Sequence, residues 1–229
     1  EISCSLVGSE MCIRDRVNKE LQELYDLEGS DKMQILKLLT RLRQLCLEPR
    51  LVYDNIDQPS SKLKACMELI KTMQENKQKV LLFSSFTSVL DLIAEECQKA
   101  GITYYMLTGS TNKEDRRELV SRFQKDDTTV FLISLKAGGT GLNLTSAEAV
   151  IHFDPWWNVS AQNQATDRAY RIGQKNNVQV FNLVMKDSVE EKIIELQKRK
   201  KELADMFVEN NSGGLSQMSK EDILSLFTM

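Results

Sequence analysis

Between residues 80 and 184, uncharged apolar runs of strand length alternate with segments whose apolar residues recur at helical spacing. Continuous apolar runs are typical of strands that are buried on both faces. The predicted strands are 80–83, 103–107, 129–134, 149–153 and 178–184. Strands of this kind that alternate with amphipathic helices form a parallel sheet. The sequence therefore predicts an α/β fold, a parallel sheet with helices on both faces.

Helical segments flank the predicted sheet at both ends. Upstream, the apolar spacing predicts helices over 17–27 and 31–47, and Pro49 ends the second of them. Downstream, capping boxes at 188–191 and 219–222 predict a long helix and a short one. Residues 1–16 are expected to be an artefactual or disordered lead, and residues 17–58 a helical connection. The sheet domain is expected over 59–187, and C-terminal brace helices over 188–229.

Composition excludes several classes of protein. The 229 residues are 41% hydrophobic and 28% charged, which is ordinary for a globular chain. The net charge is −3 at pH 7, so any nucleic-acid surface must be local. No apolar run approaches the length of a membrane span, and no cleavable signal peptide is evident. Five scattered cysteines indicate reduced thiols in an intracellular protein, and a single histidine argues against a zinc site.

Two arginines, Arg168 and Arg171, stand three residues apart in the stretch Q-A-T-D-R-A-Y-R-I-G-Q at 164–174. On a helix this spacing places both guanidinium groups on one face, where they can bind phosphate oxygens. Asp167 can hold the first arginine in place, and Gly173 is expected to end the helix. Taken alone, such a pattern is more often a solvated helix face.

A glycine-rich segment, K-A-G-G-T-G-L-N, follows a predicted strand at 136–143. Glycines lack Cβ, so their backbone N–H groups can close on an anion. Lys136 adds a charge and Thr140 a hydroxyl. A generic turn between a strand and a helix explains the segment equally well. The segment is not a Walker A loop, because no Gly-Lys pair occurs in the chain.

Hydroxyl groups follow the first predicted strand, in L-F-S-S-F-T at 82–87. Ser84, Ser85 and Thr87 can donate hydrogen bonds to DNA phosphates. They can also cap the following helix, which is slightly favoured.

Two tryptophans follow the fourth predicted strand, in H-F-D-P-W-W-N at 152–158. Trp156 and Trp157 can stack on bases, but core packing is favoured for at least one of them. We expect His152 to be a packed or partly exposed strand residue and not a ligand.

The stretch 164–174 resembles motif VI of the SWI/SNF-type ATPases of helicase superfamily two, whose form Q-A-x-D-R-x-x-R-I-G-Q is highly specific to them. The other similar segments are motif IV at 82–87, L-x-G-x-T-x-x-x-x-R at 107–116, motif V at 134–145, D-P-x-W-N at 152–158, and L-R-Q-x-C-x-x-P-x-L at 42–51. Their order and spacing match the family, so the chain is identified as a C-terminal, second RecA-like lobe, of bacterial type.

The resemblance implies that Arg168 and Arg171 reach across a cleft to the phosphates of ATP. Both ATP and Mg²⁺ would be held mainly by a first lobe, since this chain has no Walker A loop and no Asp-Glu magnesium motif. The implied further nucleotide contacts are Gln164, Asp167, Gly139, Gly141 and Asn143. The implied DNA contacts are Ser84, Ser85, Thr108, Gly109, Lys136, Gly138, Thr140 and Trp157.

The function implied by the resemblance is that of a second ATPase lobe in an ATP-dependent translocase or remodeller of double-stranded DNA, inactive without its first lobe. Expected partners are double-stranded DNA, the first lobe and a DNA-bound protein complex. The expected location is the cytoplasm if the source is bacterial and the nucleus if it is eukaryotic. A non-catalytic RecA-like interaction module is the alternative. A dinucleotide enzyme would require the loop G-x-G-x-x-G after the first strand, where residues 84–86 read S-S-F. An RNA helicase is a further alternative, and the glutamine at the start of motif VI argues against it.

Overall fold

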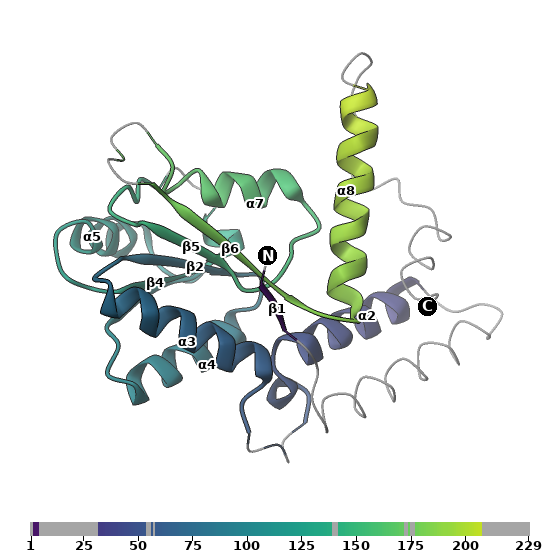
Figure 1. The fold of residues 1–229 in the computed structure, drawn as a ribbon, viewed down its shortest axis with the longest axis horizontal. Helices are drawn as coiled ribbons and strands as arrows, with labels where there is room; N and C mark the ends of the chain where they lie inside the picture. The colour runs from purple at the N-terminus through teal and green to yellow at the C-terminus, as the bar shows by residue number, and fades with distance from the viewer. Residues whose placement is uncertain are drawn as a thin grey trace.

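The computed structural model describes residues 2–4, 32–53, 56, 58–138, 142–171, 174 and 177–207. The predicted helices at 17–27 and 219–222 lie outside these residues. The described part of the chain forms a six-stranded sheet in the order β1-β6-β5-β2-β4-β3 (Figure 1). Every neighbouring pair of strands is parallel, as the sequence predicted.

All five predicted strands are confirmed to within about two residues at each end, the usual uncertainty of such boundaries. A sixth strand was not predicted, because three residues carry no periodic signal. This strand pairs with β6 at one edge of the sheet. It comes from residues 1–16, which were expected to be an artefactual or disordered lead. The strands are β1 (Ile2–Cys4), β2 (Val80–Ser84), β3 (Tyr104–Leu107), β4 (Val130–Ser134), β5 (Ala149–His152) and β6 (Gln179–Met185).

Helices cover both faces of the sheet: α3 and α4 lie on one side and α7 on the other (Figure 1). The predicted helix over 31–47 is α2, and Pro49 follows it within a short 3₁₀ turn. The described helices are α2 (Lys32–Leu47), η1 (Pro49–Leu51), α3 (Ser61–Glu75), α4 (Thr87–Lys99), α5 (Lys113–Phe123), α6 (Leu135–Gly138), α7 (Val159–Thr166) and α8 (Val189–Phe207).

Two apolar clusters fill the space between the sheet and its helices. Along β2, Val80 and Leu82 join the cluster under α3 and α4, whereas Leu81 and Phe83 join the cluster on the opposite face. This alternation follows from the two-residue period of a strand. Each such side chain contributes about 1.5–3 kcal/mol when it is fully buried. The sheet is therefore a two-faced core, which explains why its strands read as continuous apolar runs.

A third cluster attaches α2 to the beginning of α8. Leu42 and Cys46 of α2 pack there with Met185 and Val189, and Trp157 lies against the same cluster. Helix α2 is thus part of the folded unit although it precedes the sheet domain. The described cysteines Cys46, Cys66 and Cys97 are buried thiols, which agrees with the predicted reduced thiols. Among the helices described, none is long and apolar enough to cross a membrane.

Candidate functional site

The parallel sheet brings the predicted motifs to one edge, because the carboxyl ends of parallel strands lie together. Ser84 ends β2, Leu107 ends β3, Ser134 ends β4 and His152 ends β5. In open α/β sheets, ligands bind in crevices outside these ends. We call residues 84–87 and 154–157 the β2/β5 edge.

Asp154 connects the two halves of the β2/β5 edge. Its Oδ1 accepts hydrogen bonds from Ser84 Oγ at 2.7 Å and from the backbone N–H of Ser85 at 3.0 Å. The Ser85 hydroxyl donates to Oδ2. Ser84 is fully buried and Ser85 half-buried. The expectation that these serines cap α4 is wrong, since the N-cap is Phe86, whose side chain makes no capping bond.

Arg43 of α2 completes this network. Its Nη2 donates to Asp154 Oδ2 and to Ser85 Oγ, each at 3.0 Å, and to the carbonyl oxygen of Pro155 at 3.4 Å. Arg43 is 8% exposed and Asp154 1% exposed, so the two form a buried ion pair. The Arg43 guanidinium carbon lies 4.9 Å from the ring centroid of Phe86, 5.7 Å from that of Trp156 and 5.8 Å from that of Trp157.

Sequence reasoning missed both Arg43 and Asp154 as functional candidates. Arg43 lay within the segment 42–51, which indicated only a core-facing helix, and Asp154 stands 111 residues away along the chain. An arginine within an otherwise apolar helix stripe was the available signal, because a buried charge requires a partner. Trp157 is half-buried beside Arg43 and in the α2 cluster, as expected for a packed tryptophan.

The two motif VI arginines do not share a helix face. Helix α7 ends at Thr166, with Asp167 as its C-cap, and not at Gly173, which lies outside the described residues. Arg168 and Arg171 stand in the turns that follow α7. The argument from helical spacing was therefore wrong, because the helix ends before either arginine. Gln164, near the end of α7, is exposed.

Arg168 and Arg171 have opposite environments. Arg168 is only 2% exposed, whereas Arg171 and Asp167 are exposed. Among the described residues, Nε and Nη2 of Arg168 have no hydrogen-bond partner. Burial, and next the charge of Arg171, lower the pKa of Arg168, while Asp167 opposes the change. A buried guanidinium with two unused donors is costly. In this conformation neither nitrogen is accessible from outside the described fold.

Backbone hydrogen bonds hold motifs V and VI together. The N–H of Leu144 donates to the carbonyl oxygen of Arg168 at 3.1 Å. Helix α5 supports the same region, since Gln124 Nε2 donates to the carbonyl oxygen of Asn143 at 2.7 Å and Arg116 Nη1 to that of Ala137 at 3.2 Å. Motif V therefore sits between α5 and Arg168.

Most of the remaining predicted contacts follow β3 or β4 at the carboxyl edge. Lys136 is exposed and Gly138 ends α6, which follows β4. Asn143 is also exposed, but its carbonyl oxygen is bonded to Gln124 at the end of α5, so it lies toward the amino ends of β4 and β5. Thr108 and Gly109 follow β3, the first half-buried and the second exposed. Gly139, Thr140 and Gly141 lie outside the described residues.

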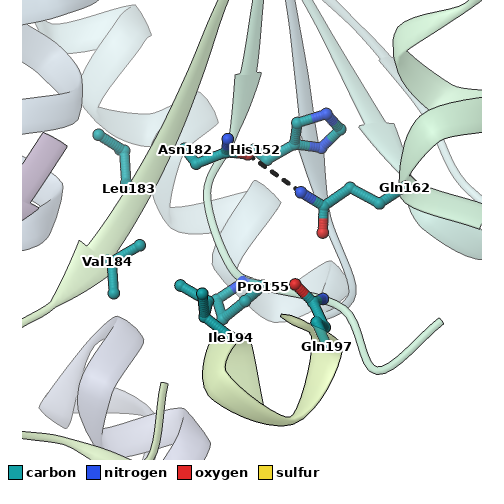
Figure 2. Close-up of a pocket in the computed structure, with 8 residues that line it drawn as sticks. All are labelled: His152, Pro155, Gln162, Asn182, Leu183, Val184, Ile194 and Gln197. Carbon is teal, nitrogen blue, oxygen red and sulfur yellow. Dashed lines mark hydrogen bonds between the residues drawn. The ribbon is translucent and has the colours of Figure 1, made fainter. Parts of the chain in front are cut away.

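His152 is packed, as predicted, and lines a pocket of about 50 Å³ between β6, α7 and α8 (Figure 2). Its Nε2 lies 2.9 Å from Thr166 Oγ1, which itself donates to the carbonyl oxygen of Gln162. His152 Nδ1 has no partner among the described residues. Gln162 also donates to Asn182 Oδ1 at 3.0 Å. This bond attaches α7, which leads to Arg168, to β6.

The single histidine gives a defined pH dependence. Burial lowers the pKa of His152 to about 4, against about 6.5 in an unfolded chain. Below pH 6.5 the unfolded chain binds a proton that the folded chain does not, so stability should fall between pH 6.5 and pH 4. His152→Gln is expected to flatten this part of the profile in urea unfolding measurements. Identical slopes for the two proteins would contradict the assignment.

Comparison with known proteins decides the family. Residues 61–173 match the family described as the helicase conserved C-terminal domain. The chain is 37% identical over 211 residues to an uncharacterized ATP-dependent helicase of Mycoplasma pneumoniae, covering 92% of this chain and 20% of that protein. The Sulfolobus solfataricus SWI2/SNF2 ATPase C-terminal domain superposes with a TM-score of 0.77 at 26% identity, covering 98% of this chain and 95% of that one.

This chain contains a SWI2/SNF2-type helicase C-terminal domain. The RecA-like fold inferred from the sequence is thereby confirmed. The Sulfolobus solfataricus SWI2/SNF2 ATPase core in complex with double-stranded DNA is also similar, with a TM-score of 0.78 and 29% identity over 98% of this chain and 48% of that one. The SWI2/SNF2-type chain spans about a fifth of the length of the curated relatives it matches.

Proposed function

We propose that this chain is the second ATPase lobe of an ATP-dependent translocase or remodeller of double-stranded DNA. The observation that carries the proposal is the exposed arginine Arg171, which stands in the same motif as the buried Arg168. Arg171 would bind phosphate oxygens of ATP, presented from a first lobe, in the planar geometry that arginine favours. Arg168, whose Nε and Nη2 have no partner in the described structure, would reach the same phosphates only after a conformational change that uncovers its side chain.

The proposed nucleotide contacts extend along the segments that surround Arg168. Motif V is a natural neighbour, because Leu144 is bonded directly to the Arg168 backbone. As the sequence indicated, the proposed set is Gln164, Asp167, Gly139, Gly141 and Asn143. A first lobe carrying the Walker A and magnesium motifs would hold ATP and Mg²⁺, and this lobe would complete the pocket.

The carboxyl edge of the sheet is the proposed DNA surface. The N-terminus of α4 has no side-chain cap, so its first backbone N–H groups are available to a phosphate. Lys136 adds an exposed positive charge at the same edge. The residues proposed to form this surface are Ser84, Ser85, Thr108, Gly109, Lys136, Gly138, Thr140 and Trp157. Ser84 would support it through Asp154 without touching DNA, because its hydroxyl is buried.

Opening and closing of the cleft between two lobes would move this lobe along the DNA backbone. Backbone contacts carry little base specificity, so movement along many sequences is expected. The solved Sulfolobus core with double-stranded DNA supports a duplex as the substrate. A cellular location where DNA is present follows from this proposal.

We expect the isolated chain to hydrolyse ATP no faster than a buffer control, since it lacks the Walker A loop. Adding a separately purified first lobe should restore hydrolysis that double-stranded DNA stimulates, measured by phosphate release. The matched control is the same mixture with Arg171→Ala in this chain. Robust turnover by the chain alone would refute the requirement for a first lobe. No restoration by any first lobe would favour a non-catalytic interaction module.

A further inference from the structure

Arg43 occupies an unusual position between two parts of the fold. It belongs to α2, which precedes residues 61–173, the part that matches the helicase C-terminal domain. Its helix is fixed by apolar packing against Met185 and Val189, at the far end of the chain. Its guanidinium nevertheless forms hydrogen bonds with Ser85 and Asp154 of the β2/β5 edge. One side chain thus connects the helical connection to the edge proposed to face DNA.

The contacts of Arg43 reach both halves of that edge. It bonds Ser85 in the first half, and Asp154 and Pro155 in the second. Its planar group also lies over the ring of Phe86, which begins α4. Since both the Ser85 hydroxyl and the Arg43 guanidinium bind Asp154 Oδ2, a shift of Arg43 must change the positions of the other two groups. The N-terminus of α4, which Ser85 precedes, is the group proposed to meet a DNA phosphate.

We propose that Arg43 is a positioning residue through which α2 sets the geometry of the β2/β5 edge, and so couples the position of the helical connection to DNA engagement. The proposal rests on the function proposed above. Asp154 acts as the relay, because it holds Arg43, Ser84 and Ser85 at once. Arg43 itself need not touch DNA, since it is only 8% exposed.

A matched control stands two residues earlier on the same helix. Arg41 also lies over an aromatic ring, with its guanidinium carbon 5.5 Å from the centroid of Tyr53, and its Nη2 donates to Tyr53 Oη at 3.3 Å. Tyr53 follows η1 and is not part of the β2/β5 edge. Replacing Arg41 therefore removes an arginine and a ring contact from α2 without disturbing Asp154.

The test uses the full-length protein that carries this chain, with Arg43→Met, Arg43→Lys and Arg41→Met. ATP hydrolysis is measured with and without linear double-stranded DNA. In Arg43→Met we expect stimulation by DNA to fall by about tenfold or more, while basal hydrolysis and the KM for ATP stay within about twofold of wild type. In Arg43→Lys the stimulation by DNA should fall by about threefold, because lysine keeps the charge but loses the two-pronged hydrogen bonding of the guanidinium and its stacking on aromatic rings. Arg41→Met should keep its stimulation within about twofold.

Three results would overturn the proposal. The first is unchanged stimulation in a folded Arg43→Met protein, and the second is an equal fall of basal and stimulated rates, which indicates structural damage only. If Arg43→Met does not fold, Arg43→Lys tests the proposal in its place. The third result is then wild-type stimulation by DNA in Arg43→Lys. A wild-type protein whose hydrolysis DNA does not stimulate would instead refute the proposed function.

Discussion

Arg171→Ala in the full-length protein is expected to lower DNA-stimulated ATP hydrolysis by about 10³–10⁵-fold, the range typical of an arginine that stabilises phosphoryl transfer. The affinity for double-stranded DNA should stay near the wild-type value. The physical reason is that the side chain of Arg171 is exposed and can meet a phosphate from a first lobe, and that removing an exposed side chain leaves the buried core unchanged. Steady-state phosphate release measures the rate of hydrolysis, and fluorescence anisotropy with a labelled duplex measures the affinity for DNA.

Arg122→Ala serves as the control for Arg171. Arg122 is also exposed, and its Nη1 lies 3.6 Å from Glu118 Oε1 on the surface of α5. A surface ion pair of this kind contributes little to stability. We expect hydrolysis within about twofold of wild type for this variant. Equal losses of hydrolysis and DNA affinity in Arg171→Ala would show that Arg171 binds DNA and does not act on ATP.

Lys62→Ala is expected to destabilise the chain by about 3–5 kcal/mol, because it leaves Glu190 as an unpaired buried carboxylate. Lys62 Nζ lies 2.6 Å from both carboxylate oxygens, and the two residues are 0% and 1% exposed. Glu190 also accepts the backbone N–H of Met185 at 2.8 Å. Urea unfolding followed by circular dichroism measures the change.

The pH dependence of Lys62→Ala provides an internal check. Burial raises the pKa of Glu190, and Lys62 opposes that shift in the wild-type chain. Without Lys62, a protonated Glu190 carries no charge, so the destabilisation should be smaller at pH 5 than at pH 8. Lys99→Ala is the control, since its pair with Glu96 lies at the surface and should contribute less than about 1 kcal/mol. A cost below about 1 kcal/mol for Lys62→Ala would contradict the ion-pair argument.

The sheet was predictable because its signal is local. Strands such as Val80–Ser84 and Val130–Ser134 are buried on both faces, and burial of both faces requires a continuous apolar run. Helix α2 was predictable for the same reason, since its apolar residues repeat at helical spacing. The motifs also indicated the correct family, because their spacing is fixed by the edge of the sheet at which they meet.

The interior of the site was not predictable, because its partners are distant in sequence. Nothing near Arg43 indicates that its carboxylate is Asp154, and nothing near Ser85 indicates that its hydroxyl is already bonded. The end of α7 at Thr166 was missed for a related reason. The backbone bond between Leu144 and Arg168 likewise joins two separate motifs, and no local pattern encodes that contact.

The ion pair between Lys62 and Glu190 also has a mechanical consequence. Lys62 stands at the beginning of α3 and Glu190 at the beginning of α8, so the ion pair joins the two points at which these helices meet the sheet. A force that separates α3 from α8 would therefore act on this buried ion pair before it reached the hydrogen bonds between the strands.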